Sequence, residues 1–490
     1  MDKYKDYVKA RVMPAPQAIE VKEGSFALKD GCKVFLHANS DWSADIVKVF
    51  ADSWNAKPEV TFIQKELPLV VDGYGLTVEK DSCTISASSR GGVLNALNAM
   101  RQMEEAERGV MKASYWQIPC VEINDFPAMA FRGIHFCWFP ETPAYEIEKL
   151  IRLAAYFRYN YVILESWGVI KLESHPEFCW DEFAVSKTEI RRLVELAASL
   201  GITLCPQVNI FGHGTASRGE SAKHVLLDKH PEYASLYEAD GWTWCISNPC
   251  TRQYLTDIVT EIHELFGNPP YFHIGCDEAD NAGNCSLCHD DYPRRFKDYL
   301  MYFHDLLASR GARSMMWHDM LLNRKDERWK GYIVHGDPFV VSDNFLSELP
   351  KDIIICDWQY GYPEKDGKEP NWPTMTAFQQ AGFDVLSCPW MERKGIASIG
   401  RFTAENHLFG MLETTWHWMC GTSSFATAFT CAANAAWNPF AKPSNNTSIW
   451  QYTEFTAHAV RRIGRDMELT SYSQLGTAQY QVPIQPNIKG

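Results

Sequence analysis

Two adjacent carboxylates, Asp277 and Glu278, follow a short apolar run at 271–274. Two acids held side by side repel when both are ionised, so in a dry site one keeps its proton near neutral pH while the other stays charged. Such a pair suits glycoside cleavage, in which one group protonates the leaving oxygen and another stabilises the developing positive charge. An isolated Asp-Glu pair is more often solvated at the start of a helix. The rest of the chain must decide between these interpretations.

A second candidate cluster is Cys285-Ser-Leu-Cys288-His289. It matches the attachment pattern of c-type haem, but a single copy in a loop, without an export signal, does not favour haem. Together with Cys276, these residues offer sulfur and imidazole for a tetrahedral zinc site. Free thiols in a loop are the alternative, and we expect no cofactor for the chemistry itself.

The composition is that of a globular protein with more than one domain. The chain has 490 residues, of which 46% are hydrophobic and 22% charged. Its net charge is −14 and it has no long Lys/Arg run, so nucleic acid and anionic membranes are not expected partners. The 17 tryptophans fill a core or provide flat faces that stack on ligands.

The sequence also predicts a compartment. It has no run of eighteen apolar residues, which excludes a membrane-spanning helix, and its first residues lack an apolar signal core. Several cysteines lie in strand-like runs, where a reduced thiol acts as a small hydrophobe: Cys137, Cys205, Cys356 and Cys388. We therefore expect a reducing, cytoplasmic environment.

Residues 1–125 are predicted to form a small α+β domain, in which short strands precede one helix at 91–103. The strand-like segments are 34–36, 60–62, 69–71, 74–77 and 83–87. A proline at 127 closes the linker to the next domain.

Residues 126–440 alternate strand and helix, which predicts an α/β fold of the (β/α)8 TIM-barrel type. The predicted strands are 130–137, 161–165, 203–208, 271–275, 314–317, 353–358, 385–389 and 410–414. The predicted helices include 146–157, 187–200, 251–266 and 294–309. A doubly wound open sheet is the competing fold, but its glycine-rich phosphate fingerprint is absent. Residues 441–490 are predicted to form a short helix near 452–463 and an extended tail.

Each predicted barrel strand carries, at or near its end, residues that can hydrogen-bond or stack. Because barrel chemistry gathers at the carboxyl ends of the strands, we expect these side chains to converge on one mouth. In chain order they are Arg132 and His135, Glu165 and Trp167, Asn209 and His213, Asp277 and Glu278, Trp317 and Asp319, Trp358 and Tyr360, Trp390, and Glu413 and Trp416.

With these residues in view, the chain resembles glycoside hydrolase family 20, the β-N-acetylhexosaminidases. The resemblance rests on His-Ile-Gly-Cys-Asp-Glu at 273–278, with Cys276 where glycine is usual. The other segments that carry it are 13–17 and 91–92 in the first domain, and 131–133, 187–201, 205–206 and 212–213 in the barrel.

The departures from the family pattern concern strands one to three. Cys137 stands where an aspartate is common, and residues 160–165 lack the usual histidines and aspartate. The third strand reads Pro-Gln-Val-Asn and then Phe-Gly-His, at 206–213, in place of Pro-Glu-Ile-Asp and Pro-Gly-His. Leu-Glu at strand two, Phe-Gly-His at strand three and Gly-Cys-Asp-Glu at strand four resemble the divergent branch that includes hexosaminidase D. The resemblance implies removal of terminal β-linked GlcNAc, GalNAc or both from glycans, with retention of configuration.

The resemblance also implies substrate-assisted catalysis. The acetamido oxygen of the sugar would attack the anomeric carbon, Asp277 would hold the acetamido N–H and offset the charge of the oxazolinium ring, and Glu278 would act as acid and then base. The sugar hydroxyls would be bound by Arg132, Asp319 and Glu413, and the two acids would be oriented by His213 and His273. The acetamido methyl would be enclosed by Trp317, Trp358 and Trp416, and the acetamido oxygen would accept a hydrogen bond from Tyr360. The pocket would be completed by Glu165 and Trp390.

Two other functions remain open from the sequence. One is a glycan-binding protein that keeps the pocket without turnover, although a lectin has little need of two adjacent acids. The other is a barrel glycosidase with a protein nucleophile, which would use Glu278 with Glu165 or Glu413.

Overall fold

The structure is a computed structural model that describes residues 2–106, 116–140, 142–214, 224–342, 344–363, 368–416, 426–441 and 449–468. The chain divides into two compact units. Unit 1 comprises Met1–Arg132, Arg152–Asn160 and Phe425–Thr477, and unit 2 comprises Gly133–Ile151, Tyr161–Ser424 and Ala478–Gly490. No helix of the described residues is long and apolar enough to cross a membrane.

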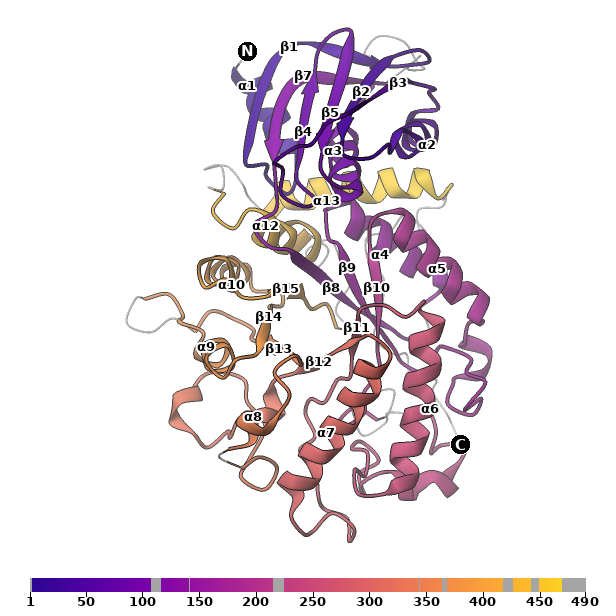
Figure 1. Cartoon of the computed structure of the whole chain (residues 1–490), viewed down its shortest axis with the longest axis vertical. Helices are drawn as coiled ribbons and strands as arrows, with labels where there is room; N and C mark the ends of the chain where they lie inside the picture. Colours follow the sequence, from indigo (N-terminus) through magenta and orange to yellow (C-terminus); the bar gives the residue numbers. More distant parts are fainter. Residues whose placement is uncertain are drawn as a thin grey trace. The chain divides into compact units, whose positions relative to one another are not determined.

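Unit 1 is built on a mixed sheet in the order β1-β7-β4-β5-β2-β3, with β6 paired to β7 (Figure 1). Its strands are β1 (Ala18–Leu28), β2 (Lys33–Ala38), β3 (Glu59–Gln64), β4 (Tyr74–Val78), β5 (Ser82–Ala87), β6 (Glu105–Ala106) and β7 (Trp116–Asp125). Its helices are α1 (Asp2–Arg11), α2 (Ser43–Trp54), α3 (Arg90–Met103), α12 (Ala432–Trp437) and α13 (Ile449–Asp466).

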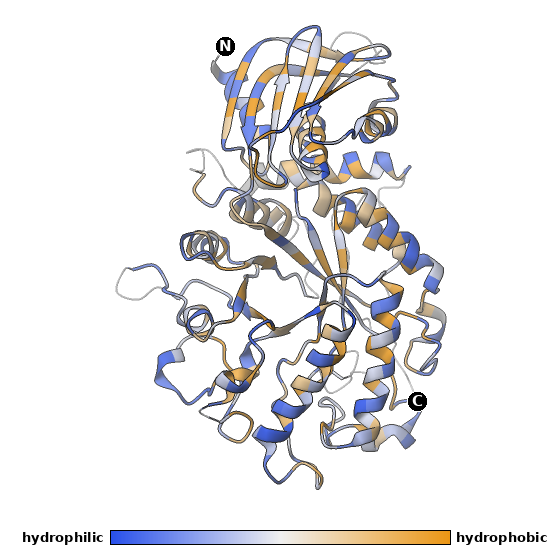
Figure 2. Cartoon of the chain, in the orientation of Figure 1, coloured by the Kyte–Doolittle hydropathy of each residue, from blue (hydrophilic) through white to orange (hydrophobic). Residues whose placement is uncertain are grey.

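The central strands of this sheet form because apolar side chains alternate along them. In β4 and β5 every second residue is buried, including Leu76 and Ile85, and Figure 2 shows the alternation of hydrophobic and hydrophilic positions. Helix α3 contacts these two strands, and the hydroxyl of Ser89 caps it by accepting the N–H of Gly92 at 3.2 Å. The sequence predicts this helix, β4 and β5 within one or two residues.

Helix α13 belongs to unit 1 through ionic contacts. Arg462 Nε lies 3.1 Å and Arg465 Nη2 lies 2.7 Å from Glu104 Oε1, and Arg462 also donates to the carbonyl of Ser53. The predicted helix near 452–463 is therefore present and longer than expected. The predicted tail beyond it lies outside the described residues.

Unit 2 contains a closed parallel barrel in the order β8-β9-β10-β11-β12-β13-β14-β15 (Figure 1), which confirms the TIM-barrel prediction. Its strands are β8 (Phe131–Trp138), β9 (Tyr161–Ser166), β10 (Thr203–Gln207), β11 (Tyr271–His273), β12 (Arg313–Trp317), β13 (Ile354–Trp358), β14 (Asp384–Cys388) and β15 (Gly410–Glu413). The helices of the βα units are α4 (Ala144–Tyr156), α5 (Lys187–Ser199), α6 (Pro249–Leu265), α7 (Tyr292–Ser309), α8 (Phe345–Glu348), α9 (Pro373–Gln380) and α10 (Arg393–Glu405).

The register of the barrel places the strand ends at one level. Cys137 pairs with Glu165, Glu165 with Gln207, and Gln207 with His273. The residues that follow β10 and β11 therefore begin at the same rim as the last residues of β8 and β9.

Several details of the first unit differ from the sequence prediction, which gave it one helix: α1 and α2 precede α3 and were not predicted. Residues 69–71 are not a strand, because Val70 and Val71 are exposed and the Val70 carbonyl accepts the N–H of Gly73 in a turn. Strands β1 and β7 were not predicted, although they pair with each other over most of their length. Strand β1 is largely exposed and its pairing is interrupted between Val21 and Ser25, so it lacks a regular apolar alternation.

Candidate active site

The backbone after β11 turns sharply and brings both acids to the rim. Gly275, Cys276 and Glu278 have φ values of 68°, 78° and 48°, in the left-handed region. A Cβ on Gly275 would lie 2.2 Å from Asn209 Oδ1, so only glycine fits there. Because the strand ends at His273, successive side chains need not point to opposite faces, and Asp277 and Glu278 reach the same partner.

That partner is His213. Its Nε2 lies 3.2 Å from Asp277 Oδ2 and 3.3 Å from Glu278 Oε2, and its ring centroid is 4.2 Å from that of Trp242. Burial favours the neutral imidazole, but the charge of Asp277 and the bonds to both acids outweigh it and raise the pKa of His213 to about 10. His213 is therefore protonated at neutral pH and offsets the repulsion between the acids.

Asp277 can still accept a hydrogen bond from a ligand. Its side chain is 5% exposed, and its Oδ1 has no hydrogen-bond partner among the described residues. A buried carboxylate oxygen that accepts no hydrogen bond raises the free energy of the folded protein, and an N–H group of a bound ligand would supply the missing bond. Glu278 is more open, with a side chain that is 24% exposed, as a group that exchanges protons with substrate and water requires.

Asp319 holds the backbone of the acid pair. Its Oδ2 accepts the N–H of Glu278 at 3.0 Å, its Oδ1 accepts the indole N–H of Trp358 at 3.1 Å, and its side chain is buried. Burial and the charge of Asp277 raise the pKa of Asp319 well above its usual range. The sequence predicts that Asp319 binds sugar hydroxyls, and the structure adds a positioning role, because its two bonds hold the backbone of Glu278 and the indole of Trp358.

Glu165 is likewise enclosed by protein groups. Its Oε2 lies 3.1 Å from His135 Nε2 and 3.2 Å from Cys137 Sγ, and its Oε1 accepts the amide of Asn209 at 2.6 Å. Burial would raise the pKa of Glu165, but the hydrogen bond and charge of His135 and the Asn209 amide lower it to about 2. The carboxylate is thus ionised and already bonded, which does not suit a nucleophile.

Aromatic side chains from neighbouring strand ends form one connected group. Trp317 lies 4.3 Å from the His273 ring and 5.3 Å from Trp416, as ring-centroid distances. Trp416 donates its indole N–H to the hydroxyl of Tyr360. Tyr360 in turn lies 5.2 Å from Trp358 and 5.0 Å from Trp390. Five of the six predicted aromatic residues and His273 are therefore brought together, while the sixth, Trp167, lies 5.9 Å from the His213 ring.

His273 and Glu413 are buried, and neither forms an ion pair with another of the described residues. The Nδ1 of His273 accepts the N–H of Gly275 at 3.0 Å, and burial lowers the pKa of His273 well below its usual range. Burial also raises the pKa of Glu413 well above its usual range, which favours its neutral form. Among the described residues, Glu413 Oε2 and His273 Nε2 lack hydrogen-bond partners.

Arg132 does not join this group. It lies near the amino-terminal end of β8, at the opposite end of the strand from the rim. Its guanidinium donates to Asp72 Oδ2 at 2.8 Å and to the carbonyls of Arg158, Met129 and Ala130. The predicted role in binding sugar hydroxyls is corrected here: the buried guanidinium is already bonded within unit 1.

Sequence reasoning also missed two residues beside Glu278. Trp242, from the loop after β10, donates its indole N–H to the carbonyl of Glu278 at 3.1 Å. His335 Nε2 lies 4.0 Å from Glu278 Oε1, and the His335 ring stacks on Trp358 at 6.0 Å. Neither residue ends a strand, so the rule that predicted the other site residues could not find them.

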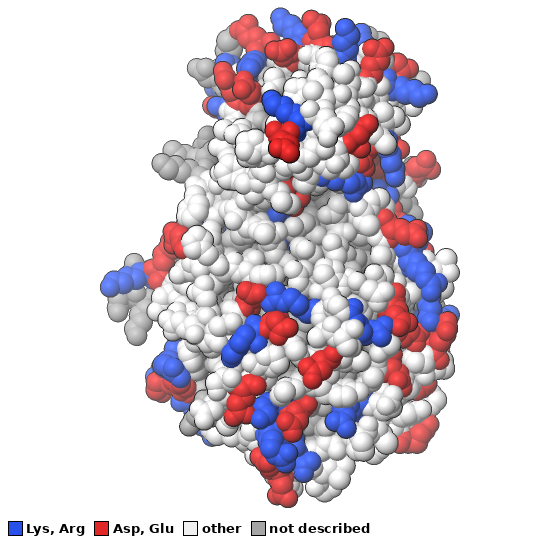
Figure 3. Space-filling view, in the orientation of Figure 1, with Lys and Arg blue, Asp and Glu red and all other residues white. Residues whose placement is uncertain are grey.

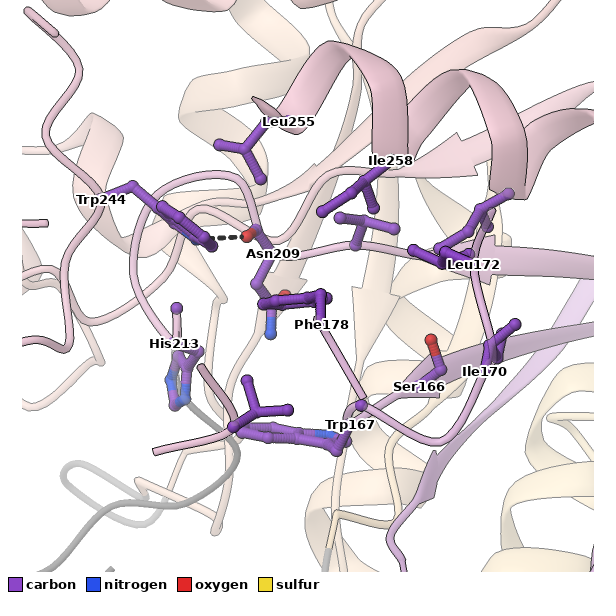
Figure 4. A pocket seen from close by; sticks show the side chains of 15 residues that line it. Ser166, Trp167, Ile170, Leu172, Phe178, Asn209, His213, Trp244, Leu255 and Ile258 are labelled. Carbon is purple, nitrogen blue, oxygen red and sulfur yellow. Dashed lines mark hydrogen bonds between the residues drawn. The ribbon is translucent and has the colours of Figure 1, made fainter. Parts of the chain in front are cut away.

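An apolar pocket borders the site on one side (Figure 4). Figure 4 shows Trp167, Phe178 and Leu255 around it, with His213 and Asn209 on its edge. Asp277 and Glu278 do not line this pocket. We therefore place the candidate active site where the acids, His213 and the aromatic group converge, because the chemistry depends on the acids.

The predicted zinc ligands are separated in the structure. Cys276 is buried, with its Sγ 3.4 Å from the carbonyl of Ile274, and His289 is exposed. Cys285 and Cys288 instead lie beside Cys245. The predicted set of four is therefore wrong for Cys276 and His289.

The comparisons with known proteins decide the family. The model of "Glycosyl hydrolase family 20, catalytic domain" matches residues 165–394, and that of "Glycosyl hydrolase family 20, domain 2" matches residues 9–126. The chain belongs to glycoside hydrolase family 20. The catalytic-domain match contains Asp277, Glu278 and the residues that contact them.

The curated relatives share low identity with the chain. A beta-hexosaminidase of Porphyromonas gingivalis is 23% identical over 363 residues, covering 63% of this chain and 45% of the relative. The beta-hexosaminidase subunit alpha of Rattus norvegicus is 25% identical over 348 residues, covering 65% and 58%. The chain spans about half the length of the curated relatives it matches first.

Solved structures of family 20 proteins share the fold. An exo beta-N-acetylglucosaminidase of Vibrio harveyi, in complex with N-acetylglucosamine, has a TM-score of 0.67 at 16% identity, covering 94% of this chain and 78% of that one. A beta-N-acetylhexosaminidase of Bacteroides fragilis has a TM-score of 0.66 at 17% identity, covering 90% and 93%.

Proposed function

We propose that the chain is an exo-acting, retaining β-N-acetylhexosaminidase that removes terminal β-linked GlcNAc, GalNAc or both from glycans. The observation that carries the proposal is the placement of Asp277 and Glu278 at 3.2 and 3.3 Å from one protonated histidine, beside an aromatic wall. Membership of family 20 and the names of the relatives support it.

The unpartnered Oδ1 of Asp277 supports substrate-assisted catalysis. In this mechanism the acetamido N–H donates to Asp277, which turns the acetamido oxygen toward the anomeric carbon. That oxygen forms the new C–O bond as the bond to the leaving group breaks, and Glu278 gives its proton to the leaving oxygen. Water then opens the oxazolinium ring, and Glu278 takes the proton back, so the configuration is retained.

The geometry favours this mechanism over a protein nucleophile. Glu165 is ionised but bonded to three protein groups, and burial favours the neutral form of Glu413. A nucleophile must be charged and accessible. The glycan-binding alternative leaves unexplained why two adjacent acids share one cationic histidine.

The proposed partner is a carbohydrate rather than a nucleic acid. Acidic and basic side chains are interspersed on the face shown in Figure 3, and the net charge is −14. We also propose a reducing, cytoplasmic location, which is supported by buried thiols such as Cys205, Cys356 and Cys388 in the barrel strands.

A panel of nitrophenyl glycosides tests the function. The β-GlcNAc and β-GalNAc substrates should be cleaved, whereas the β-glucoside and β-galactoside, which lack the acetamido group, should not. Equal cleavage of the sugars without the acetamido group would exclude substrate-assisted catalysis. Binding of N-acetylhexosamines without any turnover would identify a glycan-binding protein.

A further inference from the structure

Three thiols and a carboxylate from two loops converge beside the active site. Cys245 Sγ lies 3.4 Å from Cys285 Sγ and 3.7 Å from Cys288 Sγ. One oxygen of Glu238 joins them, and all four ligand atoms lie within 4.8 Å of one another. Glu238, Cys245 and Cys288 are buried, and Cys285 is partly buried.

The geometry points to a structural zinc site formed by Cys245, Cys285, Cys288 and Glu238. In a tetrahedral site with Zn–S bonds of about 2.3 Å, neighbouring sulfur atoms are separated by about 3.8 Å. The two measured separations, 3.4 and 3.7 Å, are near this value and far above the S–S bond length of about 2.05 Å in a disulfide. Sulfur-rich sets of four ligands favour zinc over magnesium or calcium, which prefer oxygen.

The surroundings of the ligands fit this role. The Glu238 carboxylate is fixed by the N–H groups of Gly283, at 3.2 Å, and Cys285, at 2.7 Å. Each oxygen has a second lone pair that can bind a metal. The hydroxyl of Ser247, 3.2 Å from Cys288 Sγ, can donate to that sulfur once it is a thiolate. Such outer hydrogen bonds orient metal ligands.

The site would connect two loops that carry active-site groups. Glu238 and Cys245 lie in the loop after β10, which also holds Trp242, and Cys285 and Cys288 lie in the loop after β11, a few residues past Glu278. At the active-site end the two loops are linked by the bond from Trp242 to the Glu278 carbonyl and by the contacts of His213 with Asp277 and Glu278. Zinc would add a metal-ligand link between the same two loops and thereby help to fix the position of Glu278.

Metal analysis of the whole chain tests the proposal without relying on activity. The protein is produced in zinc-supplemented medium, purified without chelators or a metal column, and measured by plasma mass spectrometry. We expect about one zinc per chain, as a closed four-ligand site requires. Cys285→Ser and Cys288→Ser should each reduce it below about 0.2, whereas Cys250→Ser, an exposed cysteine outside the cluster, should not.

A second measurement keeps the test informative if the serine variants do not fold. Replacement of the metal in wild-type protein by Co²⁺ should give thiolate-to-cobalt charge-transfer absorption and the visible bands of a tetrahedral site. Zinc removal by a chelator should lower the thermal midpoint of the wild type. Zinc below about 0.2 per wild-type chain would overturn the proposal, as would peptide mapping without reductant that finds a Cys245–Cys285 disulfide.

Discussion

His213 Nε2 lies 3.2 Å from Oδ2 of Asp277, and this ion pair organises the site. The same nitrogen of His213 lies 3.3 Å from Oε2 of Glu278, so its positive charge reduces the electrostatic repulsion between the two carboxylates. The same pair links the loop after β10 to the loop after β11. The state of His213 should therefore affect both stability and catalysis.

The unfolding free energy should depend on pH through the protonation of His213. Its pKa is raised from 6.5 to about 10 on folding, so its contribution is full below pH 6.5 and is lost as the pH rises to about 10. The difference in unfolding free energy between wild type and His213→Gln should shrink across this window, by at most about 1.4 kcal/mol per pH unit. Urea unfolding at pH 6 and pH 9.5 measures it. A difference that stays constant would mean that His213 is not a buried cation.

Glu278→Gln should show whether Glu278 is the general acid that protonates the leaving group. The amide cannot give a proton, so the rate constant should fall by about 10²- to 10⁴-fold with poor leaving groups and less with a nitrophenyl group, which needs little protonation. Asp298→Asn, an exposed acid on α7, is the matched control. Equal losses with both leaving groups would remove Glu278 as the acid.

Asp277→Asn should affect the acetamido group rather than the leaving group. The amide cannot stabilise the charge of the oxazolinium ring, and its NH₂ opposes the substrate N–H, so we expect a loss of about 10²-fold or more in kcat. This loss should be similar for good and poor leaving groups, in contrast to Glu278→Gln. A loss that follows leaving-group ability would reverse the two assignments.

The sequence predicts the barrel well because each strand is a short apolar run between amphipathic helices, and all eight predicted strands are present. It predicts which residues reach the rim because strand ends are fixed by that pattern, as for Trp317 and Tyr360. The sequence prediction of site residues fails for Arg132, because this residue lies near the amino-terminal end of β8 and the site is at the carboxyl end. It also fails for Cys245, which lies 40 residues before Cys285 and meets it only in the folded chain.

Replacement by glutamine should have different effects at Glu165, which is bonded to protein groups, and at Glu413, whose neutral form is favoured. Glu165→Gln should replace the charged acceptor that His135 and the Asn209 amide contact with a neutral amide, at a cost of about 2 kcal/mol in unfolding free energy for hydrogen bonds to a charged group. Glu413→Gln replaces an acid whose neutral form is favoured with a neutral amide and should keep activity within about tenfold. Urea unfolding and nitrophenyl-glycoside kinetics measure both. A loss of 10⁴-fold or more in Glu413→Gln would instead indicate a protein nucleophile.

Arg132 gives a final test, because its structural role and its predicted sugar-binding role affect different quantities. The side chain is buried, and its guanidinium lies 2.8 Å from Asp72 Oδ2, beside three backbone carbonyls. Arg132→Met removes the cation beside Asp72 and one donor from each of those carbonyls, so the unfolding free energy should fall by about 3 kcal/mol. The KM of the protein that remains folded should stay within about twofold, because Arg132 lies near the amino-terminal end of β8, away from the rim. Active-site titration corrects the rate for the folded fraction. Normal stability with a tenfold higher KM would show that Arg132 binds the sugar after all.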